Sequence, residues 1–131
     1  MKLKSMFAAM LAVAALTGCE EVFEDGNMQP DGSKPNITIK APTTNQAITK
    51  TQGLRIFLSA FDKDEVKELE FTVKGGETNL LSFGRAMHKT AFEFDTTVAV
   101  STLSSGTYQL LVRATDGRTN VSEQQVSFTV K

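Results

Sequence analysis

The strongest constraint on the fold is an alternation of apolar and polar residues between residues 36 and 131. In a β-strand successive side chains point to opposite faces, so a period of two gathers every second residue on one face. The stretch LRIFLSAF, residues 54–61, aligns Leu54, Ile56 and Leu58 in this way. Turn-forming residues separate the alternating stretches, which are rich in Val, Ile, Thr and Phe. The pattern predicts an all-β antiparallel sandwich.

Five further stretches show the same alternation and define the expected core. Roughly 95 residues suffice for one small domain and are too few for two. We therefore expect one sandwich of about seven strands at residues 36–131. Gly75 and Gly76 indicate a hairpin turn between two of the strands. The other residues expected to face inward are Ile37, Ile39, Ala60, Leu69, Phe71, Val73, Phe92, Phe94, Tyr108, Leu110, Val112, Ala114, Val126, Phe128 and Val130.

The first 18 residues have the features of a cleaved signal. Lys2 and Lys4 precede an apolar run at residues 6–16. As a helix this run would rise only about 16 Å, roughly half the hydrocarbon thickness of a bilayer. A basic start and a short apolar run are typical of a secretory signal peptide, and the run is too short for a stable membrane span. We expect residues 1–18 to be removed.

The apolar run ends in Leu16-Thr17-Gly18-Cys19, and Cys19 is the only cysteine of the chain. A single cysteine excludes an intramolecular disulfide and a cysteine-based zinc site. LTGC resembles the lipobox of bacterial lipoproteins. The resemblance implies cleavage after Gly18, a diacylglycerol on the Cys19 sulfur and an acyl chain such as palmitate on the new amino group. The alternative is a buried free thiol that behaves as a small hydrophobe.

Residues 19–35 are predicted to be a flexible acidic tether, because glycines and prolines interrupt them and no helix or strand period is present. In enteric lipoproteins an aspartate after the lipidated cysteine retains the protein in the inner membrane. The Glu at that position here implies the outer membrane. Acidic residues behind the cysteine also resemble a surface-export signal of Bacteroidetes lipoproteins. The cell surface, the periplasmic face and a merely solvated linker therefore stay open for Glu20, Glu21, Glu24 and Asp25.

The charge balance limits the class of partner. The chain has 14 Lys and Arg against 15 Asp and Glu, and two of the lysines lie in the predicted signal. The processed chain would therefore be acidic. This balance argues against nucleic acid, which needs a basic surface, and against a polybasic contact with membranes.

Three segments follow one another in the order seen in bacterial immunoglobulin-like domains, which are close to fibronectin type III and cadherin-like modules. These segments are AFDKDEVKELEFTVKGG, FEFDTT and LSSGTYQLLVRATDGRTN. The resemblance covers nearly all of residues 35–131. It implies that Tyr108 is a corner tyrosine, whose hydroxyl bonds to nearby backbone.

No catalytic constellation emerges from the sequence. His88 is the only histidine, so a multi-histidine metal site is excluded, and we expect it in an exposed loop. The chain contains neither a G-x-S-x-G elbow nor a glycine-rich phosphate loop. We predict a protein that is not an enzyme and needs no cofactor.

Asp62, Asp64 and Asp116 form the one acidic cluster of interest, because their loops would emerge at the same end of a sandwich. Glu65 and Asn120 lie beside them in the sequence. The likeness to cadherin-like modules implies calcium, which takes six to eight oxygen ligands. The run lacks EF-hand spacing, however, and acidic residues at strand ends commonly cap turns. We expect turn capping and no metal, with calcium as the alternative.

The most apolar irregular segment is NLLSFGRAMH, which contains Leu80, Leu81, Phe83 and Met87. We expect a strand that covers the core there, with an exposed patch for a partner protein as the alternative. These observations favour an outer-membrane lipoprotein whose immunoglobulin-like domain binds an unidentified protein or glycan, or supports an envelope complex. The alternatives are an accessory subunit or inhibitor of an envelope enzyme or transporter, and a calcium-stabilised adhesin-like module.

Overall fold

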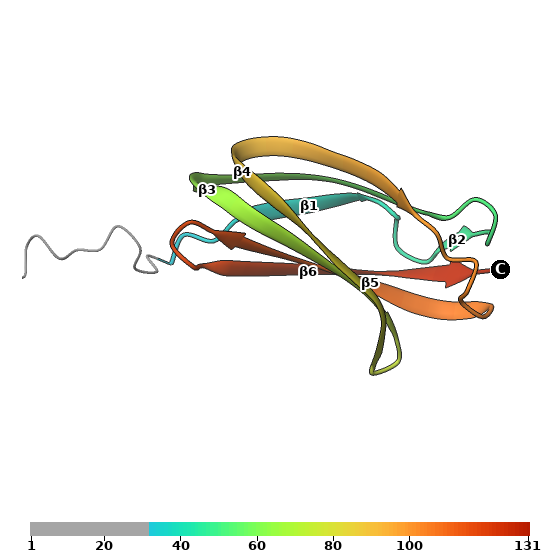
Figure 1. Cartoon of the computed structure of the whole chain (residues 1–131). Helices are drawn as coiled ribbons and strands as arrows, with labels where there is room; N and C mark the ends of the chain where they lie inside the picture. The colour runs from blue at the N-terminus through green and yellow to red at the C-terminus, as the bar shows by residue number, and fades with distance from the viewer. Residues whose placement is uncertain (1–31) are drawn as a thin grey trace, which may run out of the picture.

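Six strands make up most of residues 32–131, the part of the chain that the computed structural model describes (Figure 1). The strands confirm the predicted all-β class. The predicted signal peptide, the lipid site Cys19 with its cleavage after Gly18, and the tether as far as residue 31 lie outside the described residues. The strands are β1 (Asn36–Ala41), β2 (Gln46–Ile48), β3 (Leu54–Gly75), β4 (Thr78–Val98), β5 (Gly106–Asp116) and β6 (Val121–Val130).

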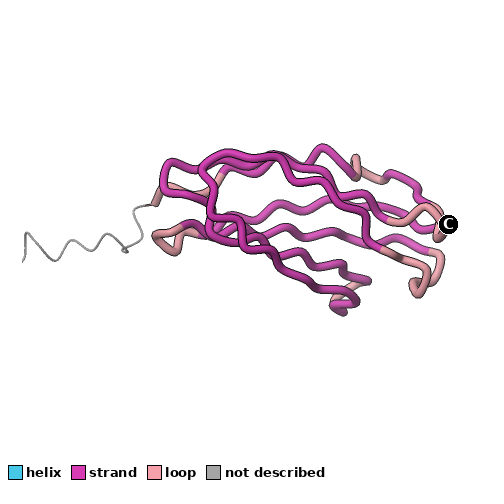
Figure 2. Tube along the Cα trace, turned by 45° about the horizontal axis from the view of Figure 1, so that its top comes forward, coloured by secondary structure: helices cyan, strands magenta, loops and turns pink. Residues whose placement is uncertain are grey.

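The two longest strands, β3 and β4, each contribute to both layers of the sandwich. The first part of β3 pairs with β1 and with the end of β4, from Ala91 to Val98. The second part of β3 pairs with the beginning of β4 and with β5. Strand β6 extends this second layer beside β5, and β2 pairs with β6 in parallel. Figure 2 shows the strands running along one long direction, with short loops at the ends.

The sandwich has six strands where the sequence predicted about seven, because stretches expected as separate strands are joined through bends. Strand β3 bends between Phe61 and Val66, where its register shifts and Glu65 adopts a φ of 69°. Strand β4 passes the same point at His88, whose φ is 53°. His88 therefore lies in a strand and not in the expected loop, although its side chain is exposed. Its Nδ1 is 3.1 Å from Glu65 Oε1.

Most of the core consists of residues that the alternation predicted, and four buried residues that it did not predict complete it: Ile48, Val66, Val100 and Leu103. Leu54, Ile56, Leu58, Leu69 and Val112 are fully buried, as are most of their counterparts on β5 and β6. Ile39, Phe92, Phe94 and Val126 are partly buried against this core. Removing such side chains from water is the main favourable term in folding, about 25 cal/mol per Å² of apolar surface.

Phe71 joins the two layers at the centre of the core. Its ring stacks on Phe83, its neighbour on β4 in the same layer, with 4.7 Å between the ring centroids. It also stacks on Phe94, which belongs to the part of β4 in the other layer, at 5.1 Å. Offset aromatic pairs at these separations add to the energy of burial.

The predicted hairpin turn is confirmed between β3 and β4. Strand β3 ends at Gly75 and β4 begins at Thr78, and the two residues are paired across the turn. Gly76 has a φ of 66°, a conformation in which a Cβ atom is unfavourable. Glycine at this position therefore allows a two-residue connection between strands of unusual length.

The expected corner tyrosine is also confirmed. The Tyr108 hydroxyl donates a hydrogen bond of 2.6 Å to the Ser104 carbonyl oxygen, in the loop before β5. The ring packs on Phe128, with 5.9 Å between centroids. This bond ties the loop to the side of the core.

We expect Tyr108→Phe to lower the free energy of unfolding by about 1–3 kcal/mol, because the Ser104 carbonyl oxygen loses its donor while the packing of the ring is kept. Chemical denaturation followed by circular dichroism measures the difference. Ser104→Ala is the matched control, because it keeps the backbone carbonyl and should leave the stability unchanged. A Tyr108→Phe protein as stable as the wild type would show that water replaces the hydroxyl at no cost.

Candidate functional site

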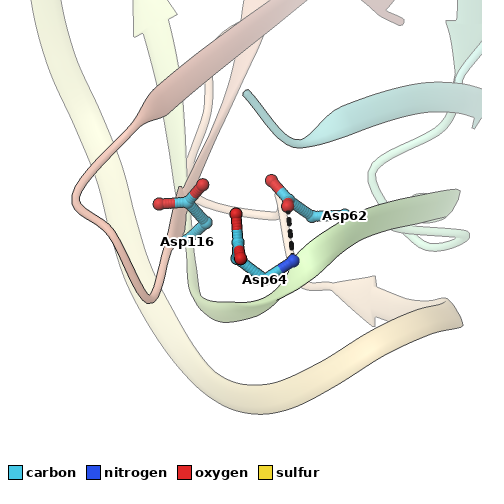
Figure 3. Close-up of side chains that lie close together, drawn as sticks. All are labelled: Asp62, Asp64 and Asp116. Atoms are coloured by element: carbon cyan, nitrogen blue, oxygen red, sulfur yellow. Dashed lines mark hydrogen bonds between the residues drawn. The ribbon is translucent and has the colours of Figure 1, made fainter. Parts of the chain in front are cut away.

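Three carboxylates meet at the bend of β3. Asp62 and Asp64 lie on the bend itself, and Asp116 is the last residue of β5 (Figure 3). One oxygen from each of the three lies within 4.8 Å of the others. The sequence predicted that these residues share one end of the sandwich, and the structure brings them into one cluster.

Part of this cluster caps turns, as the sequence predicted. Asp62 Oδ1 accepts a hydrogen bond from the Asp64 backbone N–H at 2.8 Å. Asp116 Oδ1 accepts bonds from the backbone N–H groups of Arg118 and Asn120, at 2.9 and 2.8 Å. Asp116 Oδ2 accepts a third bond, from Asn120 Nδ2 at 3.0 Å. These bonds hold the turn between β5 and β6 in shape.

The second oxygen of Asp62 is different. Asp62 is only 5% exposed, and its Oδ2 is buried without a hydrogen-bond partner. Burial raises the pKa of Asp62 above its ordinary value of 3.8, and the nearby Asp116 and Asp64 carboxylates raise it further, while the bond from the Asp64 N–H lowers it. A buried carboxylate oxygen that lacks a donor carries a desolvation cost. A proton shared with Asp116 would offset this cost, and such a side-chain hydrogen bond is a further cause of the raised pKa of Asp62.

The sign of this effect on stability follows from proton linkage. A carboxyl group whose pKa is higher in the folded state holds its proton more tightly there. The contribution of Asp62 to stability therefore falls as the pH rises from 3.8 through the raised pKa. At neutral pH, an ionised Asp62 opposes folding unless positive charge lies close to it.

The nearby basic side chains lie against Asp64. Lys63 Nζ is 2.9 Å from Asp64 Oδ2, although the geometry is not that of a hydrogen bond. Arg118 Nε is 3.4 Å from Asp64 Oδ1. Asp64 is thus compensated at the edge of the cluster, whereas Asp62 and Asp116 are buried deeper, at 5% and 0% exposure.

The cluster lies close to the point where the described part of the chain begins. The Gly32 backbone N–H donates a 3.2 Å hydrogen bond to Asn120 Oδ1, and Asn120 in turn bonds to Asp116. Gly117 N–H donates to the Glu65 carbonyl oxygen at 3.1 Å, which closes the β5–β6 turn over the bend of β3. Pro35, the last residue before β1, is buried. One hydrogen-bonded chain therefore connects the first described residue to the acidic cluster.

The apolar candidates for partner binding lie along the first half of β4. Leu81, Phe83 and Met87 are partly buried and pack against the core. Leu80 alone of the four is exposed, at 41%. These residues therefore contribute mainly to the sandwich.

Sequence reasoning overlooked a second surface, on the outward face of the first half of β3. Lys40 Nζ and the Arg55 guanidinium lie 5.0 and 5.1 Å from the centre of the Phe57 ring. Phe61, further along the same face, is 59% exposed. The sequence does contain an indication of this surface. In the stretch 54–61, the outward-facing positions, which are usually polar, include two phenylalanines, Phe57 and Phe61.

An open groove of about 410 Å³ lies between β1 and β6, lined among others by Ile37, Ile39, Pro42 and Val126. Within residues 32–131 there is no helix of the length and apolar character needed to cross a bilayer.

Comparison with known proteins agrees with this architecture. Fibronectin(III)-like modules of CbhA from Clostridium thermocellum have a TM-score of 0.52 at 22% identity, over 76% of this chain and 47% of theirs. Wild-type OgpA from Akkermansia muciniphila has a TM-score of 0.60 at 14% identity, over 83% of this chain and 33% of its own. This chain thus covers less than half of either neighbour, and at these identities the likeness shows the fold alone. The comparison with curated proteins found no match.

A family model provides the assignment. The model described as "Bacterial Ig domain" matches residues 35–130, which is nearly the whole of the described sandwich. Immunoglobulin-like and fibronectin III-like domains are typically non-catalytic and serve in binding or as structural modules. The chain belongs to the bacterial Ig domain family.

Proposed function

We propose that this protein is a lipid-anchored module of the bacterial outer membrane, whose immunoglobulin-like domain binds a protein or glycan partner or supports an envelope complex without catalysis. The supporting observation is the short distance in sequence between the LTGC motif and the folded domain. The family match begins at residue 35, and Cys19 is the last residue of that motif. The sixteen residues from 20 to 35 span at most about 55 Å when fully extended. The domain would therefore act close to the membrane.

The type of anchor follows from the chemistry of Cys19. A thiol is the nucleophile that accepts a diacylglycerol, and the resulting two or three acyl chains hold a protein far more firmly than one chain does. The acidic balance of the processed chain makes a protein or a glycan a better partner than a nucleic acid.

The experiment is metabolic labelling with an alkyne palmitate, followed by membrane fractionation. The wild type should carry the label and sediment with the outer membrane. Cys19→Ser should lose the label and accumulate as an unprocessed or mislocalised precursor, because a hydroxyl is a much weaker nucleophile than a thiolate. Protease treatment of intact cells then distinguishes the cell surface from the periplasmic face, since only a surface domain is digested.

A matched control places a thiol elsewhere. Ser33→Cys in the Cys19→Ser background restores one cysteine outside the LTGC motif and should stay unlabelled. A wild-type protein without label, or a labelled Cys19→Ser protein, would contradict the lipid anchor.

A further inference from the structure

We propose that Asp62, Asp64 and Asp116 form a calcium site at the bend of β3. The carboxylates come from two strands that are distant in sequence, and one oxygen of each lies within 4.8 Å of the others (Figure 3). A second observation favours a cation at this position. Asp62 Oδ2 is buried, has no hydrogen-bond partner, and belongs to a side chain that is 5% exposed.

The donor set selects the class of ion. All three side chains offer oxygen only, which hard cations such as calcium and magnesium prefer over zinc or copper. Calcium takes six to eight oxygens, so three carboxylates leave positions for backbone oxygens and water.

The coordination demands of the two ions favour calcium over magnesium. Calcium accepts six to eight oxygens in a flexible geometry, whereas magnesium demands a near-ideal octahedron and keeps several of its water ligands. Three carboxylate oxygens that all lie within 4.8 Å of one another can share one calcium ion, whose ligands on opposite sides are about 5 Å apart.

The turn-capping bonds are compatible with this ion. Capping occupies Oδ1 of Asp62 and Oδ1 of Asp116 through backbone N–H groups, which fixes both side chains in place. Asp62 Oδ2 remains available. Lys63 and Arg118 form their ion pairs with Asp64, at the edge of the cluster. A divalent cation would compensate the negative charge of the two buried carboxylates, Asp62 and Asp116.

The position of the site gives the ion a structural role. It would join the bend of β3 to the β5–β6 turn, and through Asn120 it would reach Gly32, where the described chain begins. Calcium would therefore stabilise the end of the domain at which the described residues begin. This inference does not depend on the proposed lipid anchor.

The test uses the full chain, purified in a mild detergent and stripped of metal with a chelator. Calorimetric titration with calcium chloride should show saturable binding, with a Kd in the range of about 10⁻⁴–10⁻³ M that is typical of extracellular modules. Calcium at 100 times its Kd should raise the Tm by about 10 °C over the chelated protein. Magnesium at the same concentration should raise the Tm less.

The variant Asp62→Asn locates the site. Asparagine keeps an oxygen for the Asp64 N–H and removes the charge, so the protein should fold and bind calcium at least about tenfold more weakly. Asp95→Asn is the matched control, because Asp95 is an exposed partner of Arg55 in the other layer and its loss should leave calcium binding unchanged.

Two outcomes would overturn the inference. Equal Tm values in calcium and in chelator, with no heat of binding, would mean that a shared proton compensates Asp62 and Asp116. Wild-type calcium affinity in Asp62→Asn would mean that the ion binds elsewhere, for example at the acidic residues that follow Cys19.

Discussion

Val112→Asp should abolish folding of the domain. Val112 is fully buried in β5, in register with Phe71 on β3 and Gln124 on β6. An aspartate there either stays ionised without a partner or is neutralised by a pKa shift of 3–5 units, and each unit costs about 1.4 kcal/mol. The loss of apolar packing adds to this cost. The total approaches or exceeds the free energy of unfolding of a typical domain, about 5–15 kcal/mol.

The measurement is far-ultraviolet circular dichroism with limited proteolysis. The variant should lack the sheet signal and be digested rapidly. Thr107→Asp, an exposed position on the same strand, is the control and should fold as the wild type does. A Val112→Asp protein with a cooperative melt near the wild-type Tm would contradict the inward orientation of this face of β5.

The second large effect is expected for Phe71→Ala. Phe71 is 1% exposed and stacks on aromatic rings of both layers, Phe83 and Phe94. Truncation removes both ring contacts and leaves a cavity where the layers meet, at a cost of about 3–5 kcal/mol. For a domain of this size, such a loss lowers the Tm by more than about 12 °C.

Thermal unfolding compares this variant with Phe61→Ala. Phe61 lies on the same strand and is 59% exposed, so its truncation should change the stability by less than about 0.5 kcal/mol. Equal Tm losses for the two variants would mean that Phe71 is not the link between the layers.

The alternation of residues predicted the fold because each strand has one face buried and one face in contact with water. The inward positions from Leu54 to Ala60 and from Tyr108 to Ala114 are buried as that pattern requires. Strand β2 was not predicted, since it has only three residues and only Ile48 is buried. The continuity of β3 and β4 was not predicted either. This continuity depends on positive φ angles at Glu65 and His88. Positive φ angles are uncommon for residues other than glycine, so nothing in the sequence indicates them at these two positions.

The acidic cluster was predicted only in outline. Connections at one end of a sandwich bring Asp62, Asp64 and Asp116 together, and a sequence reveals that much. Asp62 and Asp116 are buried where the β5–β6 turn closes over the bend of β3, through the bond from the Gly117 N–H to the Glu65 carbonyl oxygen. Asp62 Oδ2 is buried without a hydrogen-bond partner because of this contact between distant segments, which the sequence alone does not reveal.

Tension along the long axis of the domain would act on the parallel pairing of β2 with β6, as well as on the pairing of β1 with β3. The described part of the chain begins at one end of the sandwich, and the chain ends at the other (Figure 1). A pull on these two ends would drag β2 and β6 in opposite directions along their common axis. The hydrogen bonds between Gln46–Ile48 and their partners at 128–130 would then be loaded in shear, and so would the bond from the Lys131 N–H to the Ile48 carbonyl oxygen. Bonds loaded side by side must break together, whereas strands peeled apart sideways lose them one at a time. Tension along the long axis therefore meets the most resistant arrangement of these bonds, and the rate of forced unfolding depends on it.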